Sequence, residues 1–516
     1  MRRLSATLRV VPFLAALATS TACGGDGRLL ILLERPEDST LDPLRDDRLA
    51  RFSLRVDQRG KLSDQETFRS DADELTVGDV PVGSPFDLRL AGKSSSGQML
   101  GLGQVFDVNV DGDGTVVQVK FRKPIGYVAG QPGVDLVDAS ASTREKAALS
   151  PIRTISSVSA VATTPDGAWL LAVAGSSLVA LRTSNHSIWA QASIPAGGTF
   201  VAVSPDNRYA VVCHREGKEL SIVDMVKLAE KNPIAALRVP LGGKPTKAVF
   251  SGKDRSRVKV LVDGVGHLDG CSASSSLVDV LLATGQPTGT LKLNKPVADV
   301  VIDPRDDSLL MALPCEKSLG KVQNGMATKL DLGGQVPRTY DLATSDQHLV
   351  VLGSDNGTPP QGDAVLFDLS RTGFNTPQTK KFSLPQLGVS ITSAASTGAI
   401  NVSLALETFT IFDVTVAPDG QRTVCLFQAR YVSNIGVGSC NYNFNIKAMG
   451  YLVVDLTVET YLFSQLTDLV FQQCSTCDYP SQSACESWFT KGMQSGKALT
   501  TPEFEPRGTA LLFGGS

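Results

Sequence analysis

Short alternating runs of apolar and polar residues fill the N-terminal part of the chain. Residues 51–56 (RFSLRV) and 86–90 (FDLRL) alternate at every position, a period that is typical of strands with one buried face. Two further runs, 105–110 and 116–121, flank an Asp-Gly turn and predict a hairpin. We therefore expect residues 28–128 to form a β-sandwich of the Ig-like type.

A different pattern begins near residue 150, where an apolar run ending in aspartate recurs at intervals of 37 to 55 residues. This interval brackets the length of one four-stranded blade of a β-propeller. The first copy is degenerate and ends in alanine. The seven copies are residues 178–180, 222–224, 277–279, 329–331, 366–368, 411–413 and 453–455.

A second apolar strand precedes each copy, and several of these strands follow a turn with proline at its second position. The turns at 164–167 (TPDG), 204–207 (SPDN) and 303–306 (DPRD) are of this kind, and proline there fixes the φ angle that the turn needs. Two signals in phase predict repeated sheets that bury their faces against one another. These strands are 168–173, 208–212, 258–262, 309–312, 349–352, 400–404 and 445–448.

The Ser-Pro-Asp turn, the apolar strand after it and the Val-Asp strand resemble the repeats of the YVTN and lactonase-like β-propeller superfamily, over roughly residues 151–470. The resemblance and the seven copies imply an all-β fold with a seven-bladed propeller at 151–472. Six or eight blades are the alternatives, because the first and last copies are the weakest. Lactonase-like propellers hold calcium and acidic residues in the central tunnel. We carry over no catalytic residue, because the recurring aspartates are expected to bond to the turn that follows.

The segments beside the propeller are assigned from composition. Residues 129–150 are rich in Gly, Ala, Ser and Asp and are expected to be a linker. Residues 473–516 carry cysteines and end in an apolar run at 509–513 (TALLF). We expect this extension to close the propeller if its last strand pairs back onto the domain, although the sequence does not assign that strand a partner.

The first 22 residues have the three parts of a secretory signal peptide: an arginine-containing start, an apolar core and small residues that lead to Cys23. Small residues before a cysteine resemble the bacterial lipobox, which implies that Cys23 is lipidated and that residues 23–27 are a tether. Ser20 replaces the leucine that usually stands three residues before the cysteine, and an ordinary cleaved signal is the alternative. We expect an exported lipoprotein of the bacterial cell envelope, in the periplasm or at the outer membrane.

Eight cysteines remain once Cys23 is set aside, and an even number in an exported protein favours disulfide bonds. Sequence does not choose among the pairings, although Cys271 and Cys315 lie in neighbouring blade loops and could clamp them together. The CxxC pair at Cys474 and Cys477 has no second pair beside it, so structural bridging is favoured over a zinc or redox site. The eight candidates are Cys213, Cys271, Cys315, Cys425, Cys440, Cys474, Cys477 and Cys485.

Three consecutive units have long loops between their second and third strands, beginning near residues 264, 314 and 354. Loops longer than a turn requires often carry binding residues, and these three are expected on one face of the ring. The alternative is that the loops have no binding role. The predicted binding rim consists of His267, Asp269, Glu316, Lys317, Asp355 and Asn356.

Charge and motifs argue against several classes of function. A formal net charge of −3 over 516 residues gives no reason to expect nucleic acid as a partner. The sequence has no HExxH or GxSxG motif. Asn109 and Asp111 resemble the start of a calcium loop, but Lys120 stands at its twelfth position. We expect no catalytic residue, no metal and no cofactor.

Two functions remain in different classes. The leading hypothesis is a non-enzymatic binding or scaffold protein, held at a membrane by its lipid, that binds protein or polysaccharide through the propeller loops. The alternative is a lactonase-like or quinoprotein-type enzyme with a ligand in the central channel, which predicts a funnel lined by acidic residues. Fold alone does not separate the two hypotheses.

Overall fold

The computed structural model describes residues 27–511 with internal gaps, and at some strand positions it describes the backbone alone. The gaps are residues 59–60, 63–65, 70–73, 81, 84, 112–113, 232–233, 253, 266–270, 272–273, 324, 331–338, 346–347, 356–360, 369–377, 383–386, 393–398, 418–419, 421, 438–439, 457–460, 476–480 and 496–504.

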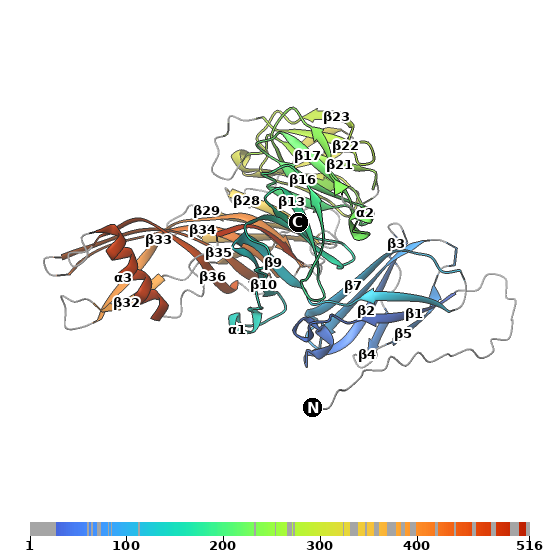
Figure 1. The fold of residues 1–516 in the computed structure, drawn as a ribbon, viewed down its shortest axis with the longest axis horizontal. Helices are drawn as coiled ribbons and strands as arrows, with labels where there is room; N and C mark the ends of the chain where they lie inside the picture. The colour runs from blue at the N-terminus through green and yellow to red at the C-terminus, as the bar shows by residue number, and fades with distance from the viewer. Residues whose placement is uncertain are drawn as a thin grey trace.

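The N-terminal part is a sandwich of two sheets, at the lower right of Figure 1. Along β6, buried and half-buried side chains alternate over all nine residues, as a strand with one core face requires. Phe52 and Phe121 meet edge to face with ring centroids 5.5 Å apart. One sheet has the order β5 (Glu74–Val80), β1 (Gly27–Glu34), β8 (Thr115–Lys120); the other has β3 (Lys61–Leu62), β2 (Leu49–Gln58), β6 (Phe86–Ser94), β7 (Met99–Val108), with β4 (Glu66–Arg69) also on β2.

The hairpin predicted for 105–110 and 116–121 is wrong. Strand β7 pairs with β6, whereas β8 crosses to the other sheet and pairs with β1 in parallel, with Thr115 opposite Leu29. Alternation specifies which face of a strand is buried, here that of Val117 and Val119, but not which strand lies beside it. Two short 3₁₀ turns, η1 (Ser39–Leu41) and η2 (Pro43–Arg45), follow β1.

Five successive four-stranded antiparallel sheets follow in the described chain, and each is a propeller blade. We letter the strands of a blade A to D from the innermost outward. The first blade gains an outer parallel strand, β18 (Ile234–Ala235), and α2 (Met225–Ala229) follows the third strand of the second blade. The strand bounds of the five blades follow.

The first blade has β11 (Val158–Thr163), β12 (Trp169–Ala174), β13 (Ser177–Arg182) and β14 (Ile188–Ser193). The second has β15 (Phe200–Val203), β16 (Tyr209–His214), β17 (Glu219–Asp224) and β19 (Leu237–Pro240). The third has β20 (Pro245–Phe250), β21 (Arg257–Val262), β22 (Ser276–Leu281) and β23 (Pro287–Lys292). The fourth has β24 (Val300–Ile302), β25 (Leu309–Leu313), β26 (Ser318–Gln323) and β27 (Met326–Leu330). The fifth has β28 (Thr339–Thr344), β29 (His348–Asp355), β30 (Gln361–Asp368) and β31 (Gln378–Phe382).

The sixth blade is built from strands two to three times longer than those of its neighbours. Its A to D strands are β33 (Ala399–Val416), β34 (Arg422–Val437), β35 (Cys440–Asp455) and β36 (Tyr461–Ser475). The second half of β33 pairs with β34 inside the ring, and its first half pairs with β32 (Leu387–Thr392). We call the outer half of this sheet, with β32 and α3, the arm; it extends to the left in Figure 1.

The repeat count from sequence needs correction at three copies. The strands predicted at 400–404 and 411–413 both lie in β33, and those at 445–448 and 453–455 both lie in β35. The predicted sixth and seventh units are therefore one sheet. Residues 329 and 330 of the fourth copy lie on the D strand of the fourth blade instead of its C strand, and residue 331 lies outside the described residues.

Helix α3 (Gln482–Ser495) is fastened to the arm by a disulfide and by aromatic packing. Cys485 on the helix is bonded to Cys474 on β36. The ring of Phe489 lies 4.9 Å from that of Phe444 and 5.4 Å from that of Phe471, centroid to centroid. One continuous apolar core therefore runs from the fifth blade through the sixth to the helix.

The last described strand of the chain closes the ring. Strand β37 (Glu505–Leu511) pairs with β9 (Ile125–Gln131), which pairs with β10 (Gly133–Asp138), and we call these three the closing sheet. Its A strand, β37, contacts the A strands of both the first and the sixth blades, so the described A strands touch in a closed cycle of seven. Seven is the predicted number, but the seventh sheet comes from the two ends of the propeller chain.

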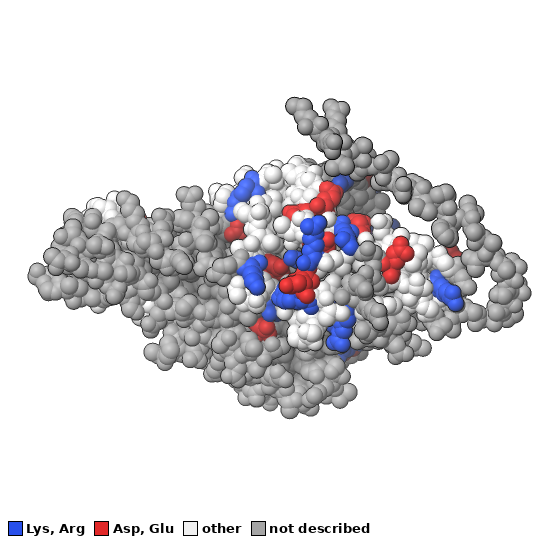
Figure 2. Space-filling view, turned by 90° about the horizontal axis from the view of Figure 1, so that it is seen from below, with Lys and Arg blue, Asp and Glu red and all other residues white. Residues whose placement is uncertain are grey.

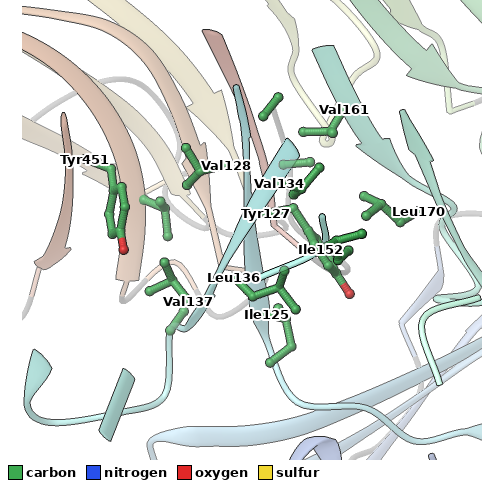
Figure 3. Close-up of a cluster of buried hydrophobic side chains, with 14 of the residues drawn as sticks. Ile125, Tyr127, Val128, Val134, Leu136, Val137, Ile152, Val161, Leu170 and Tyr451 are labelled. Atoms are coloured by element: carbon green, nitrogen blue, oxygen red, sulfur yellow. The ribbon is translucent and has the colours of Figure 1, made fainter. Parts of the chain in front are cut away.

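The linker predicted at 129–150 is therefore wrong. It contains the end of β9, the whole of β10, all of whose residues are buried, and the short helix α1 (Arg144–Ala147). Figure 3 shows Tyr127, Val134 and Ile152 meeting Val161 and Leu170 of the first blade in one cluster. The closing sheet contains small residues that are buried in its core. Its composition therefore resembles that of a loop.

Breaking the closing sheet should destabilise the whole propeller. Ala510 of β37 is 7% exposed and lies opposite Tyr127. Because an Ala510→Asp carboxylate has no partner in that core, we expect it to lower the free energy of unfolding by about 3 kcal/mol or more. Urea unfolding followed by tryptophan fluorescence measures the change. Met326→Asp is the control, since Met326 is 68% exposed; equal stability of both variants would contradict the closure.

Candidate binding face of the propeller

The sandwich occupies one side of the propeller. Lys120 reaches Asp166 in the A–B turn of the first blade (Nζ to Oδ2, 3.4 Å), and Arg255 in the A–B turn of the third blade reaches Asp87 at 3.3 Å and Asp107 at 3.0 Å. In an antiparallel blade, the A–B and C–D turns share one side of the ring and the B–C loops share the other. We call this other side the B–C face; it carries the loops that the sequence singles out.

Two of the six predicted rim residues are fully described. Glu316 ends the 3₁₀ turn η3 (Pro314–Glu316), and Lys317 follows it in a left-handed conformation with φ of 45°. Asp355 ends β29, but its side chain is outside the described part; His267, Asp269 and Asn356 lie outside the described residues altogether. That these residues form a binding rim stays a prediction.

Glu316 is held by two lysines and Lys317 is exposed. Lys295 lies 2.8 Å from a carboxylate oxygen of Glu316 and Lys329 lies 3.6 Å from the other. The hydrogen bond from Lys295 lowers the pKa of Glu316. Similar mixing of charge is visible elsewhere on the surface: in Figure 2, Lys and Arg lie beside Asp and Glu over the middle of the molecule. Of the two residues, Lys317 is the better placed to meet a partner.

A disulfide clamps the loops of the third and fourth blades together. Cys271 and Cys315 are bonded, with Cα atoms 5.8 Å apart, as their places in neighbouring B–C loops indicate. The bond covalently fixes two loops of the B–C face relative to each other. Such a constraint reduces the conformational entropy that binding would otherwise cost.

Two other cysteines are not bonded, so their prediction as disulfide candidates is wrong. Cys213 and Cys425 are buried free thiols in separate cores, and burial raises the pKa of each. They behave as small apolar side chains. Cys440 begins β35 with its side chain undescribed, and Cys477 lies outside the described residues.

Sequence reasoning missed a cluster of charged side chains on the innermost strands, which we call the channel cluster. Lys247 lies near the start of β20, Asp299 directly before β24, Asp341 on β28 and Asp413 on β33. Four successive blades thus contribute one charged residue each. Lys247, Asp299 and Asp341 lie at the strand ends that adjoin the B–C face.

Asp299 is the centre of the cluster. Its side chain is 2% exposed and accepts from Lys247 Nζ at 2.5 Å, from Val300 N at 2.8 Å and from Leu342 N at 2.9 Å. Burial alone would raise the pKa of Asp299, but the charge of Lys247 and the hydrogen bonds from Asp341, Lys247 and Leu342 outweigh it and hold the pKa below its usual value. One carboxylate therefore joins the third, fourth and fifth blades.

The pKa of Asp341 shifts in the opposite direction to that of Asp299. Burial and the negative charge of Asp299 together raise its pKa well above the usual value, and Asp413 adds to the effect. The neutral Asp341 carboxyl donates a hydrogen bond to Asp299. For Lys247, burial lowers the pKa, but the charges of Asp299 and Asp341 more than compensate and raise it. The cluster thus keeps a cation, an anion and a neutral acid in contact.

The contacts of Asp299 join the innermost strands of three neighbouring blades. Within the described ranges, no group of three or more His, Cys, Asp or Glu side chains is placed to hold a metal ion. No described helix is long and apolar enough to cross a bilayer. A sequence signal for the cluster does exist: a charged residue lies in, or directly before, the first strand of each of four consecutive units.

Comparison with known proteins finds only weak likeness to solved structures. No protein-family model and no curated protein matches the chain. Solved structures that it resembles contain β-propellers. Dihydro-heme d1 dehydrogenase NirN in complex with DHE is 12% identical, with 69% of this chain and 75% of that chain covered and a TM-score of 0.38.

Two further structures are similar at the same level. Kuenenia stuttgartiensis hydrazine synthase is 14% identical, with 58% of this chain and 70% of that chain covered and a TM-score of 0.32. A nidogen/laminin complex is 12% identical, with 48% of this chain and 89% of that chain covered and a TM-score of 0.33. Similarity this low says nothing about activity. The chain is an all-β protein with a propeller.

The channel cluster predicts a specific dependence of stability on pH. In the unfolded chain Asp341 ionises near the ordinary carboxyl pKa, whereas in the folded protein its raised pKa keeps the proton. The folded state therefore binds more protons, and this group's stabilisation is lost as pH rises toward the folded pKa. In Asp341→Asn the amide replaces the neutral acid as a donor to Asp299.

We expect the stability of Asp341→Asn, relative to the wild type, to increase as the pH rises above about 4, the ordinary carboxyl pKa. Urea unfolding at several pH values measures the difference. A difference that does not change with pH would show that Asp341 ionises normally in the folded protein.

Proposed function

We propose that the protein is a non-enzymatic lipoprotein of the bacterial cell envelope, anchored through Cys23, that binds a protein or polysaccharide partner through the B–C face of its propeller. The observation that carries the proposal is the Cys271–Cys315 bond. It fixes two of the three long loops on the side of the ring opposite the sandwich contacts. A rigid, loop-bearing face of this kind is suited to recognition.

The disulfide bonds are consistent with the proposed location in the cell envelope. Two disulfides in the described chain, Cys271–Cys315 and Cys474–Cys485, suit a compartment that is oxidising, such as the periplasm. The residues before Cys23 support export and lipidation, as set out from the sequence. The sandwich, which follows the tether, then acts as a spacer between the lipid anchor and the propeller.

An enzyme with a ligand in the channel is the second candidate, and the channel cluster is the observation that favours it. Lys247, Asp299 and Asp341 meet near the strand ends that adjoin the B–C face, and the charge of Asp413 also acts on Lys247. The hydrogen bonds of Asp299, however, are directed to Lys247 and to two backbone amides, which suits a structural role. Binding of a small ligand that changes when Asp413 is replaced by Asn would favour the enzyme.

Reversing the charge of an exposed rim residue should weaken partner binding. Lys317→Glu keeps the backbone conformation and alters only the exposed side chain, so we expect at least about a tenfold loss of affinity. Cross-linking in intact cells identifies the partner, and titration with the purified partner gives the dissociation constant. The control is Lys227→Glu on α2, which lies toward the sandwich side. Equal affinity of both variants would contradict the rim.

Removing the lipidation cysteine should release the protein from the membrane. Cys23→Ser leaves the sandwich and propeller unchanged but removes the acceptor of the lipid. Fractionation should find the wild type with membranes and the variant in the soluble periplasmic fraction. Retention in the membrane fraction of Cys23→Ser molecules from which residues 1–22 have been removed, as judged by mass, would rule out this anchor.

A further inference from the structure

The end of the sandwich where the described chain begins is defined by three strands. Gly27 of β1 lies opposite Val80 of β5, and Gly114 donates its backbone N–H to the carbonyl of Arg28. On the other side of β1, Val116 of β8 lies beside Leu30. The end of β5 and the start of β8 therefore both lie beside the start of β1.

This end carries apolar side chains that no other part of the sandwich covers. Val82 is 44% exposed and Val116 is 55% exposed. Leu30 and Leu32, on the outer face of β1, are half-buried. Leu29 and Ile31, on its core face, are fully buried. Among described large apolar residues, exposure above 40% is found at only seven positions, and two of them lie here.

Covalent geometry places this end close to the residue that we propose is lipidated. Four residue steps separate Cys23 from Gly27, and a fully extended chain spans at most about 3.6 Å per residue. Gly27 therefore lies within about 14 Å of the Cys23 backbone, whatever conformation the intervening residues adopt. With the lipid inserted in a bilayer, Gly27 therefore stays within about 14 Å of the anchored cysteine, close to the headgroup layer.

We infer that the β1 end of the sandwich, with Leu30, Val82 and Val116, rests on the surface of the bilayer that holds the lipid of Cys23. The inference rests on the proposed anchor and adds an orientation to it. Arg28 and Asp111, both exposed at this end, carry opposite charges, so the contact is apolar and does not depend on anionic lipid. The propeller's B–C face, on the side away from the sandwich, is then turned from this contact.

Tryptophan at these positions reports the contact directly. The full-length lipidated protein is reconstituted in vesicles of phosphatidylethanolamine and phosphatidylglycerol, with and without phosphatidylcholine brominated on its acyl chains. Val116→Trp and Val82→Trp are compared with Lys292→Trp, an exposed position at the end of β23 that adjoins the B–C face. The wild-type emission is subtracted. Thermal unfolding confirms that each variant folds, and Val82→Trp serves if Val116→Trp does not.

The added emission of Val116→Trp and Val82→Trp should shift to shorter wavelength on binding and be lost with brominated lipid, while that of Lys292→Trp should not change. Vesicle-bound, lipidated protein in which all three are quenched alike, or not at all, would overturn the orientation and leave the anchor standing. Mass spectrometry that finds no lipid on Cys23 would overturn both.

Discussion

The antiparallel pairing of β37 with β9 holds the propeller together. Thr509 lies opposite Val128, about 380 residues away along the chain, so the pairing costs chain entropy that only the completed ring repays. A four-stranded blade is too thin to bury both of its faces alone. Without the closing sheet, the first and sixth blades would expose apolar side chains such as Val161 and Val424, which now lie in one core with Tyr127.

Closure of the ring also brings together the residues of the two features that we connect with function, the channel cluster and the Cys271–Cys315 bond. Lys247 and Asp341 come from the third and fifth blades and meet Asp299 of the fourth, so the cluster depends on how closely the blades are drawn together. The Cys271–Cys315 bond likewise spans two blades. A closed ring with an ordered centre and a clamped loop face is a rigid support, and rigidity lowers the entropic cost of recognition.

Local signals predict local structure well in this chain, and their failures have physical causes. The second strands of the first five blades were found because each is a short apolar run after a turn. In β33, bulges near Glu407 and Phe412 interrupt the alternation, so one long strand has the pattern of two. The closing sheet and the channel cluster depend on contacts between distant segments, which periodicity does not report. For the rim, sequence located the loops and the Cys271–Cys315 bond but mistook Cys213 and Cys425, whose burial in separate cores only the fold reveals.

Hydrogen exchange of the native protein tests the closed ring most directly. If β37 completes the propeller, backbone amides of Val128 and Thr509 should exchange as slowly as those of Val211 and Val260, which lie in central strands of the second and third blades, because all of them open only when the ring unfolds. Rapid exchange along β37 while the second and third blades stay protected would contradict the account, since the ring would then be open at its C-terminal strand.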